Sequence, residues 1–541
     1  MPAPHDTSAP HDSPTISNSS RPLLLAIVAL LIVYAVCAAF HLPQTATERI
    51  LAAGQHDEDA AATIGETAPA AEDEHAEAGP SKGQPPPAWM VLPFALLLGA
   101  IAVLPLMHAT EHWWESNLHK FYIAGGLGLL TLAYYGLMHL EPIQRHFLGH
   151  AVIERSGRPF EWEFSGTIFA NAILQDYVPF IVLLFALYTI SGGIRIQGDL
   201  PARPLTNTCF LGIGALLASF IGTTGAAMLL VRPLLETNSE RKHVKHTVVF
   251  FIFAVCNCGG CLLPLGDPPL FLGYLQGVDF LWTLRLWKEW ALVNGALLAI
   301  YCAWDAFLCY PKEQRRDIAR DETTRRPLRL LGVWPNAALL LGVVISVGLL
   351  DVSKTLPGTG WHPWLYLREC VLLALVALSL MLGRESVRQA NHFNYGAIVE
   401  VAALFLGIFI CMQPALQILD VRGPSLGIDT PAKFFWITGA LSSVLDNAPT
   451  YLVFFETARA LDAPGLRTMD HVGIPDNLLA AISLGAVFMG ANTYIGNGPN
   501  FMVKTIAEKS GVRMPSFFGY MAYSGCILIP LFAIVHLLFF R

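Results

Sequence analysis

The sequence predicts an all-α polytopic membrane protein with inverted repeats, each with a re-entrant hairpin and a broken transmembrane helix. Of its 541 residues, 54% are hydrophobic and only 14% are charged. Apolar runs long enough to span a bilayer recur along the chain, which excludes an ordinary soluble protein. Two further apolar stretches are interrupted by Gly, Pro or polar residues, and the two halves of the chain resemble each other at a fixed separation.

The first 87 residues differ from the rest in composition. An apolar run follows Arg21 within residues 1–42, and it is either a signal peptide or a first transmembrane anchor. Residues 43–87 have the composition of a disordered acidic linker, which we expect in the periplasm. The later chain is predicted to contain scaffold helices at 88–167 and 330–394, inverted repeats at 168–309 and 395–541, and a cytoplasmic basic loop at 310–329.

Ten apolar segments are predicted to span the membrane, and two more are interrupted. The spans are expected near 88–107, 121–139, 168–194, 247–275, 287–309, 330–350, 364–382, 395–419, 478–506 and 517–540. Lys and Arg concentrate at 311–329 and 240–246, which the positive-inside rule places in the cytoplasm. The spans obey this rule only if 205–235 and 433–460 are re-entrant hairpins, the first entering from the cytoplasm and the second from outside.

An internal repeat relates the two halves. A shift of 224 residues aligns Ser219 with Ser443, and a shift of 230 residues aligns Asp267 with Asn497. The segments "PLGDPPLFLG" and "IGNGPNFMVK" correspond, and each places helix breakers inside an apolar span. Unwound backbone at membrane depth is tolerated only where it faces protein or a water-filled cavity. A pair of such broken segments in inverted repeats indicates a secondary transporter with its site near the bilayer midplane.

Two intramembrane acids are the main candidates for ion binding. Burying a carboxylate at the centre of a span costs about 2.5–3.5 kcal/mol on insertion scales, so Asp267 and Asp446 are functional candidates. The alternative is that each acid caps a half-helix through its backbone amides. The hairpins and broken spans that carry these acids, or adjoin them, also carry the oxygen ligands that a hard cation such as sodium prefers. These candidate ion- or substrate-binding residues are Asn447, Thr450, Thr223, Thr224, Asn492, Asn497 and Asn500, with sodium expected at Asp267, Asp446, Asn447 and Asn497.

Asp176 and Glu400 occupy equivalent positions in the two repeats. We predict that they lie near opposite membrane faces and act in proton entry or gating. The alternative is that they are ordinary interfacial acids or contacts to the scaffold.

The charge of the candidate site bears on the substrate. Carboxylates and amides predominate, and the nearest cations in the sequence are Arg232 and Lys504. A carboxylate that binds either a proton or sodium exchanges the two directly. We therefore expect a sodium/proton antiporter that works by alternating access; the alternative is a proton- or sodium-coupled carboxylate (citrate) transporter.

The chain from about residue 88 to the C-terminus resembles the bacterial sodium:proton antiporter and citrate transporter branch of the ion transporter superfamily. The segments that carry the resemblance are 176–194, 222–235, 264–278, 400–409, 442–455 and 496–504. The resemblance implies a transport domain that moves against a dimerisation scaffold. Relatives that carry dicarboxylates have Ser-Asn-Thr at both hairpin tips, whereas this chain has Gly222-Thr223-Thr224 and Asp446-Asn447-Ala448.

The remaining expectations concern partners and location. We expect a homodimer in the bacterial inner (cytoplasmic) membrane, with a small ion or a small carboxylate as its ligand and no nucleic-acid partner. Sodium and protons would be transported or coupling ions, and no other cofactor is expected. No nucleophile, base and orienting group cluster at membrane depth, so the sequence does not predict an enzyme.

Overall fold

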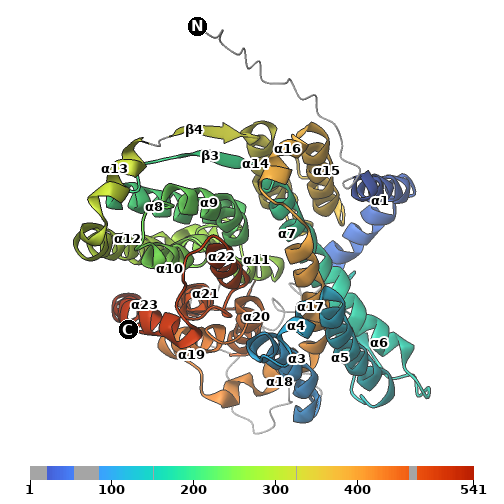
Figure 1. Ribbon diagram of the computed structural model, residues 1–541. Coiled ribbons are helices and arrows are strands. Elements are labelled where there is room, and N and C mark those ends of the chain that lie inside the picture. The colour runs from blue at the N-terminus through green and yellow to red at the C-terminus, as the bar shows by residue number, and fades with distance from the viewer. Residues whose placement is uncertain (1–20, 54–83, 150, 324–325, 462–471) are drawn as a thin grey trace.

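The structure is a computed structural model, and it describes residues 21–53, 84–149, 151–323, 326–461 and 472–541. Most of the predicted linker at 43–87, and the first part of the predicted segment 1–42, lie outside the described residues. The described chain is mostly helical, with two small antiparallel sheets (Figure 1). This confirms the predicted all-α class.

Several helices are long and apolar enough to cross a bilayer. There are 5 by length and composition in the described chain, and a bent pair makes up to 6. They are α1 (Arg21–Ala39), the continuous segment Trp162–Ser191, α8 (Pro204–Ile221), the segment Trp282–Lys312 and α23 (Phe517–Phe539), with Gly396–Cys411 and Gln413–Leu426 as the bent pair. The protein is therefore a multi-pass membrane protein.

The first repeat comprises a leading helix, a hairpin, a broken span and a closing helix. α7 (Val178–Ser191) leads into a hairpin of α8 and α9 (Thr223–Thr237). The broken span follows as α10 (Lys245–Ala254), the short helix η4 (Cys258–Cys261) and α11 (Pro268–Leu275). Prolines at 268 and 269 begin α11, where their missing amide hydrogens cost nothing. The repeat ends with α12 (Trp287–Trp304).

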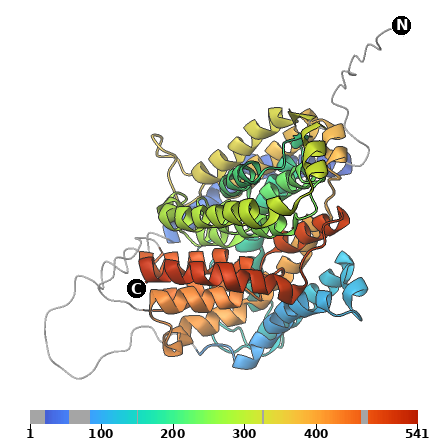
Figure 2. The same cartoon turned by 60° about the vertical axis from the view of Figure 1, so that its left-hand side comes forward.

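The second repeat has the same order. α17 (Gly396–Cys411) precedes a hairpin of α19 (Pro431–Ser442) and α20 (Asn447–Arg459). The second broken span consists of α21 (Asp476–Met489), η9 (Gly490–Asn492) and α22 (Gly498–Lys509), and α23 ends the repeat. In Figure 2, α23 lies beside the helices of this second repeat.

Hydrogen bonds at equivalent positions confirm the repeat. Ser219 Oγ donates to the carbonyl of Gly259 at 2.6 Å. In the second half, Ser443 Oγ donates to the carbonyl of Met489 at 3.1 Å. Each bond ties the end of the first hairpin helix to the broken span of the same repeat, at η4 in the first repeat and at the end of α21 in the second.

The repeats are inverted relative to each other. Phe180, at the start of α7, packs on Phe409 near the end of α17, with ring centroids 5.7 Å apart. Phe185 packs on Tyr395, at the start of α17, with centroids 6.1 Å apart. The equivalent helices α7 and α17 therefore run antiparallel.

The two repeats also contact each other crosswise. α11 of the first repeat packs on α20 of the second, and α22 of the second packs on α9 of the first. The two half-helices and two hairpins therefore enclose a common centre (Figure 1).

The remaining helices cover the outside of these repeats. α5 (Asn117–Leu137) packs along α17, and α14 (Val333–Leu349) and α15 (Leu367–Leu382) pack on α7. The other described helices and 3₁₀ or π segments are α3 (Leu92–Val103), α4 (Glu111–Trp114), α6 (Trp162–Phe169), α13 (Arg315–Thr323), α16 (Glu385–Ala390), α18 (Gln413–Arg422), η1 (Ala88–Val91), η2 (Leu104–Leu106), η3 (Ala170–Tyr177), η5 (Trp282–Leu286), η6 (Asp305–Cys309), η7 (Tyr310–Lys312) and η8 (Gly423–Leu426).

Two features differ from the sequence prediction. The span predicted at 395–419 is bent by 41° where α17 meets α18, because Pro414 in the first turn of α18 has no amide hydrogen to continue the helix. The basic loop also contains ordered structure: β4 (Arg326–Leu331) pairs antiparallel with β3 (Arg195–Asp199). The other sheet pairs β1 (Ile143–Arg145) with β2 (Ala151–Ile153).

Candidate functional site

Four helices begin at the centre of the fold. They are α9, α11, α20 and α22, one hairpin arm and one half-helix from each repeat. A helix N-terminus presents unpaired amide hydrogens and the positive end of the helix dipole. The centre is therefore suited to bind negative charge.

Asp267 joins the ends of these helices. It is the N-cap residue of α11, and its carboxylate accepts three side-chain hydrogen bonds instead of capping its own helix. The donors are Thr223 of α9 at 2.9 Å, Asn447 of α20 at 2.5 Å and Asn497, the N-cap residue of α22, at 3.1 Å. The side chain is only 1% exposed. The predicted acid is thus buried at the meeting point of both repeats.

Glycines allow the backbone to approach this closely. A Cβ added at Gly266 would lie 2.1 Å from the carbonyl oxygen of Gly260. At the equivalent position of the second repeat, a Cβ at Gly496 would lie 2.6 Å from the carbonyl oxygen of Gly490. The carbonyl of Gly266 also accepts a 2.8 Å hydrogen bond from the amide of Thr223. The broken spans therefore need glycine at both positions for steric reasons.

An amide network supports the second half-helix. Asn497 donates to the carbonyl of Cys256 and to Asn257 as well as to Asp267. Asn257 in turn donates to Asn500 at 2.7 Å, and Asn500 donates to the carbonyls of Gly490 and Thr493. Asn500 therefore serves to hold the unwound segment in place. Asn257 was missed by the sequence analysis, although a single Asn inside the apolar run "FFIFAVCNC" was a visible signal.

Asp446 differs from Asp267 in its bonding. It is the N-cap residue of α20, and its side chain accepts a 3.1 Å hydrogen bond from the amide of Ala448. Thr450 donates to the backbone carbonyl of Asp446 at 2.9 Å. The capping alternative weighed for both acids therefore describes Asp446 but not Asp267. Asp446 is also partly exposed, whereas Asp267 is buried.

Two amide oxygens in the second repeat are candidate cation ligands. The side-chain oxygens of Asn447 and Asn492 are buried and have no hydrogen-bond partner among the described residues. Their amide nitrogens are used, by Asn447 towards Asp267 and by Asn492 towards Ser443 Oγ at 2.9 Å. A buried acceptor without a partner is costly. A bound cation would satisfy it, since hard cations prefer such oxygens.

Thr224 and the two candidate cations lie outside this network. Thr224 is partly exposed, and its side chain makes no hydrogen bond to a described residue. Lys504 pairs with Glu508 at 3.2 Å and lies over the ring of Tyr494. Arg232 lines a separate cavity with Arg195. No guanidinium or ammonium group bonds to Asp267 in the described structure.

Asp176 and Glu400 are not brought together. Asp176 is buried in η3 and accepts a hydrogen bond from Gln276, at the end of α11, at 3.3 Å. Glu400, whose side chain is 43% exposed, forms a 2.6 Å ion pair with the buried Lys120 of α5. Asp176 thus contacts the core of the repeats, and Glu400 contacts a scaffold helix.

Comparison with known proteins identifies the family. Residues 83–540 match the family described as "Putative citrate transport". None of the curated proteins matches the chain. The matched segment contains both repeats and all four helix ends at the centre. The chain therefore belongs to this citrate transport family, and its paired broken repeats are those of a secondary transporter.

Proposed function

We propose that the protein is an ion-coupled secondary transporter of small carboxylates such as citrate, which works by alternating access in the bacterial inner membrane. The observation that carries this proposal is the convergence of four helix N-termini on one buried acid, Asp267. The family match supports a carboxylate rather than a simple ion as the substrate.

The helix ends supply the recognition chemistry. Amide hydrogens and aligned peptide dipoles at helix N-termini bind carboxylate groups without any Lys or Arg. In transporters with broken helices, these half-helix ends point at the anionic part of the substrate, while unwound carbonyls hold the coupling ion. The absence of a bonded cation at the described centre therefore does not argue against an anionic substrate.

Asp267 couples transport of the carboxylate to binding of a proton or sodium ion. An ionised Asp267 would repel an incoming carboxylate at the same helix ends, and at short range in a poorly solvated site this repulsion costs several kcal/mol. A proton or sodium ion bound at Asp267 removes that charge. The unpartnered oxygen of Asn447, which bonds Asp267 through its amide nitrogen, provides a further ligand for sodium. Substrate therefore binds only after the cation, which links the two fluxes.

Uptake of labelled citrate into proteoliposomes tests this proposal. We expect accumulation driven by an inward sodium or proton gradient and none without a gradient. Asp267→Asn retains a side chain of similar shape but carries no charge, so its uptake should no longer respond to the gradient. The proposal would be wrong if the wild-type protein moved no carboxylate under any gradient.

The second candidate function is sodium/proton antiport. It is favoured by a specific observation: Asp267 and Asp446 are carboxylates of the central helices, and neither is paired with Lys or Arg in the described structure. Such acids exchange a proton for sodium directly. Addition of sodium to vesicles with a preformed pH gradient discriminates the two functions. The antiporter dissipates the gradient without citrate, whereas the coupled carboxylate transporter requires citrate.

A further inference from the structure

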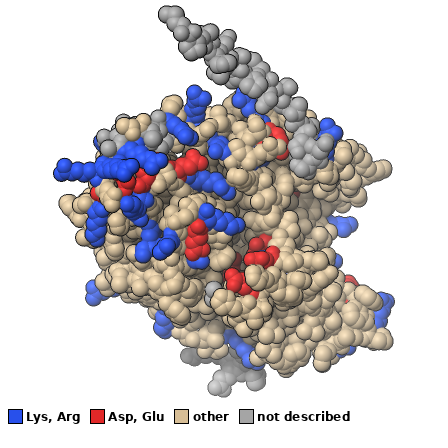
Figure 3. Space-filling view, in the orientation of Figure 1, with Lys and Arg blue, Asp and Glu red and all other residues tan. Residues whose placement is uncertain are grey.

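A cavity of 580 Å³ lies away from the central acids, where the two repeats meet at the basic face. The first repeat contributes the loop after α9 and the end of α12, and the second contributes residues 510–513 and the start of α23. Figure 3 views this face, and Lys and Arg gather where α8, α9, α12 and α13 lie in Figure 1.

Basic side chains line the cavity, and some of them pair with acids behind its wall, such as Lys242 with Asp317 at 3.4 Å. Its cationic and imidazole side chains are Arg241, Lys242, His243, Lys245, His246 and Arg513, and no Asp or Glu lines it among the described residues. Lys245 and Arg513 are exposed, and neither forms an ion pair within the described part of the chain. Their charges are therefore available to an anionic ligand.

The floor of the cavity is held rigid by a buried ion network. Arg241 binds Asp305 through two hydrogen bonds, and His246 approaches the same carboxylate at 3.0 Å. Glu313 accepts hydrogen bonds from the backbone amides of Lys242 at 3.0 Å and His243 at 2.8 Å. The loop that carries the cations is thus fixed to the end of α12 before any ligand binds. Such preorganisation lowers the entropy cost of binding.

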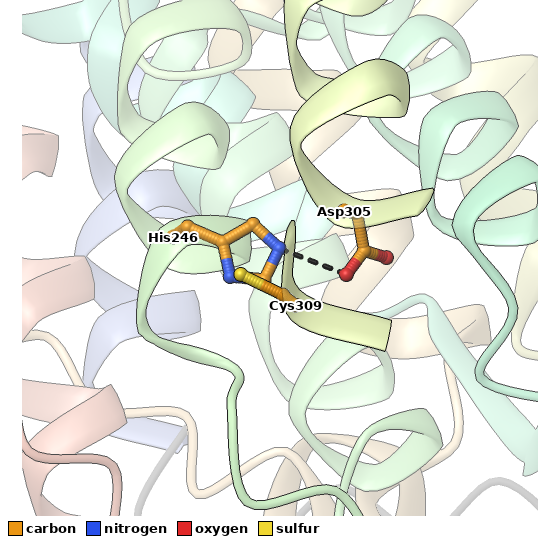
Figure 4. A group of neighbouring side chains, drawn as sticks. All are labelled: His246, Asp305 and Cys309. Carbon is orange, nitrogen blue, oxygen red and sulfur yellow. Dashed lines mark hydrogen bonds and ion pairs between the residues drawn. The ribbon is translucent and has the colours of Figure 1, made fainter. Parts of the chain in front are cut away.

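The same network argues against a metal ion. His246, Asp305 and Cys309 are neighbouring side chains (Figure 4). Their possible ligand atoms all lie within 4.8 Å of one another. However, the guanidinium of Arg241 already occupies the Asp305 carboxylate. A metal ion would have to displace this cation and leave it buried without a partner, which is costly.

An apolar wall adjoins the basic one. Trp304 of α12 and Tyr523 of α23 both line the cavity, with ring centroids 5.9 Å apart. Phe307, in η6 directly after α12, and Phe518, in α23, are each 79% exposed. Trp and Tyr are typical of the membrane interface, and exposed Phe on a spanning helix faces acyl chains. The cavity therefore opens next to lipid.

We propose that this cavity binds the phosphate headgroup of an acidic phospholipid, whose acyl chains lie along α12 and α23. Basic pockets between membrane helices on the cytoplasmic side have the chemistry for such headgroups. A soluble phosphate or carboxylate would use the cations but not the aromatic wall. Because the cavity is lined by both repeats, the bound lipid bridges them.

Titration of purified protein with labelled phosphatidylglycerol tests this site, with phosphatidylcholine of the same chain length as the uncharged comparison. We expect the acidic lipid to bind at least about tenfold more tightly. The variant Lys245→Gln with Arg513→Gln should weaken its binding by about twenty-five-fold, since each cation near an anionic surface contributes roughly a factor of five. A matched variant, Lys433→Gln with Arg422→Gln, removes the same two charges outside the cavity and should change binding less than about twofold.

Competition experiments distinguish a lipid headgroup from a soluble anion as the ligand of the cavity. Glycerol 3-phosphate, inorganic phosphate and citrate should displace the lipid only weakly, and Tyr523→Leu should weaken lipid binding while leaving glycerol 3-phosphate binding unchanged. Equal affinity for both lipids, or an unchanged affinity in the Lys245 and Arg513 variant, would overturn the proposal. Displacement by citrate at its transport concentration would instead assign the cavity to the substrate path and likewise overturn it.

Discussion

Asn447 donates a 2.5 Å hydrogen bond to Oδ2 of Asp267, a residue 180 positions earlier in the chain. This bond joins the hairpin of one repeat to the half-helix of the other. Both residues are buried, so neither can turn to water if the bond breaks. Any movement of one hairpin against the opposite half-helix must therefore change the surroundings of the central carboxylate.

The strength of this bond can be measured directly. Asn447→Ala leaves one side of a buried carboxylate without its donor, and a hydrogen bond to a charged group contributes about 1.5–3 kcal/mol. We expect the free energy of unfolding in mixed micelles to fall by that amount. Asn117→Ala is the matched control, because Asn117 makes an exposed hydrogen bond at the surface. Its effect should stay within about 0.5 kcal/mol, and equal losses in both variants would contradict the central role of Asn447.

Asp446 should contribute charge to cation binding without being needed for the fold. Asp446→Asn keeps a side-chain oxygen that caps α20, since Asn is as good an N-cap residue as Asp. The variant loses a negative charge on the residue next to Asn447, whose side-chain oxygen is unpartnered among the described residues. We expect unchanged thermal stability and a roughly tenfold higher sodium concentration for half-maximal transport, equivalent to about 1.4 kcal/mol. Unchanged sodium dependence would show that Asp446 is a cap alone.

The glycines of the broken spans provide a steric test. Gly266→Ala and Gly496→Ala would place a methyl group 2.1 Å and 2.6 Å from backbone carbonyl oxygens. Overpacking of this kind costs about 1–3 kcal/mol or more, so both variants should lose transport and stability. Gly498→Ala is the control two residues from Gly496, because a Cβ there meets nothing within 4 Å. Full activity of Gly266→Ala would mean that the unwound segment is less tightly packed than the structure shows.

Variants that break the ion pair between Glu400 and Lys120 test whether Glu400 has a structural role or a gating role. Glu400→Gln leaves the ammonium group of Lys120, which is 5% exposed, without its partner. Breaking a buried pair costs up to 3–5 kcal/mol, but Glu400 is partly solvated, so we expect roughly 1–3 kcal/mol. The double variant Lys120→Met with Glu400→Gln should recover most of this stability. If Glu400→Gln slowed transport without any loss of stability, a gating or proton-entry role would be supported instead.

Much of the fold was predictable from the sequence. Apolar runs set the positions of the helices, and Pro268, Pro269 and Pro499 mark the starts of the half-helices. The match between Asp267 and Asn497 located the broken spans because the two segments share the same breakers at the same spacing. These features were predictable because the length and hydropathy of each apolar run depend only on local sequence and not on any long-range contact.

The bonding of the site was less predictable. That Asn497 bonds to Asp267 rather than acting as a separate ligand depends on how the repeats pack against each other, which no local pattern encodes. The pairing of β3 with β4 was missed for the same reason, since the strands lie far apart in the sequence. The two acids also bond differently: Asp446 accepts a backbone amide hydrogen from Ala448, whereas Asp267 accepts side-chain donors from other helices. This difference required coordinates.

The crosswise packing of α11 on α20 and of α22 on α9 means that neither half of the gene encodes a working unit. A polypeptide that ended in the basic loop would carry Asp267 but lack two of its three hydrogen-bond donors, Asn447 and Asn497. The remaining polypeptide would carry these two donors without Asp267. Such fragments would be inert when produced separately, and they would regain activity only by assembling in one membrane.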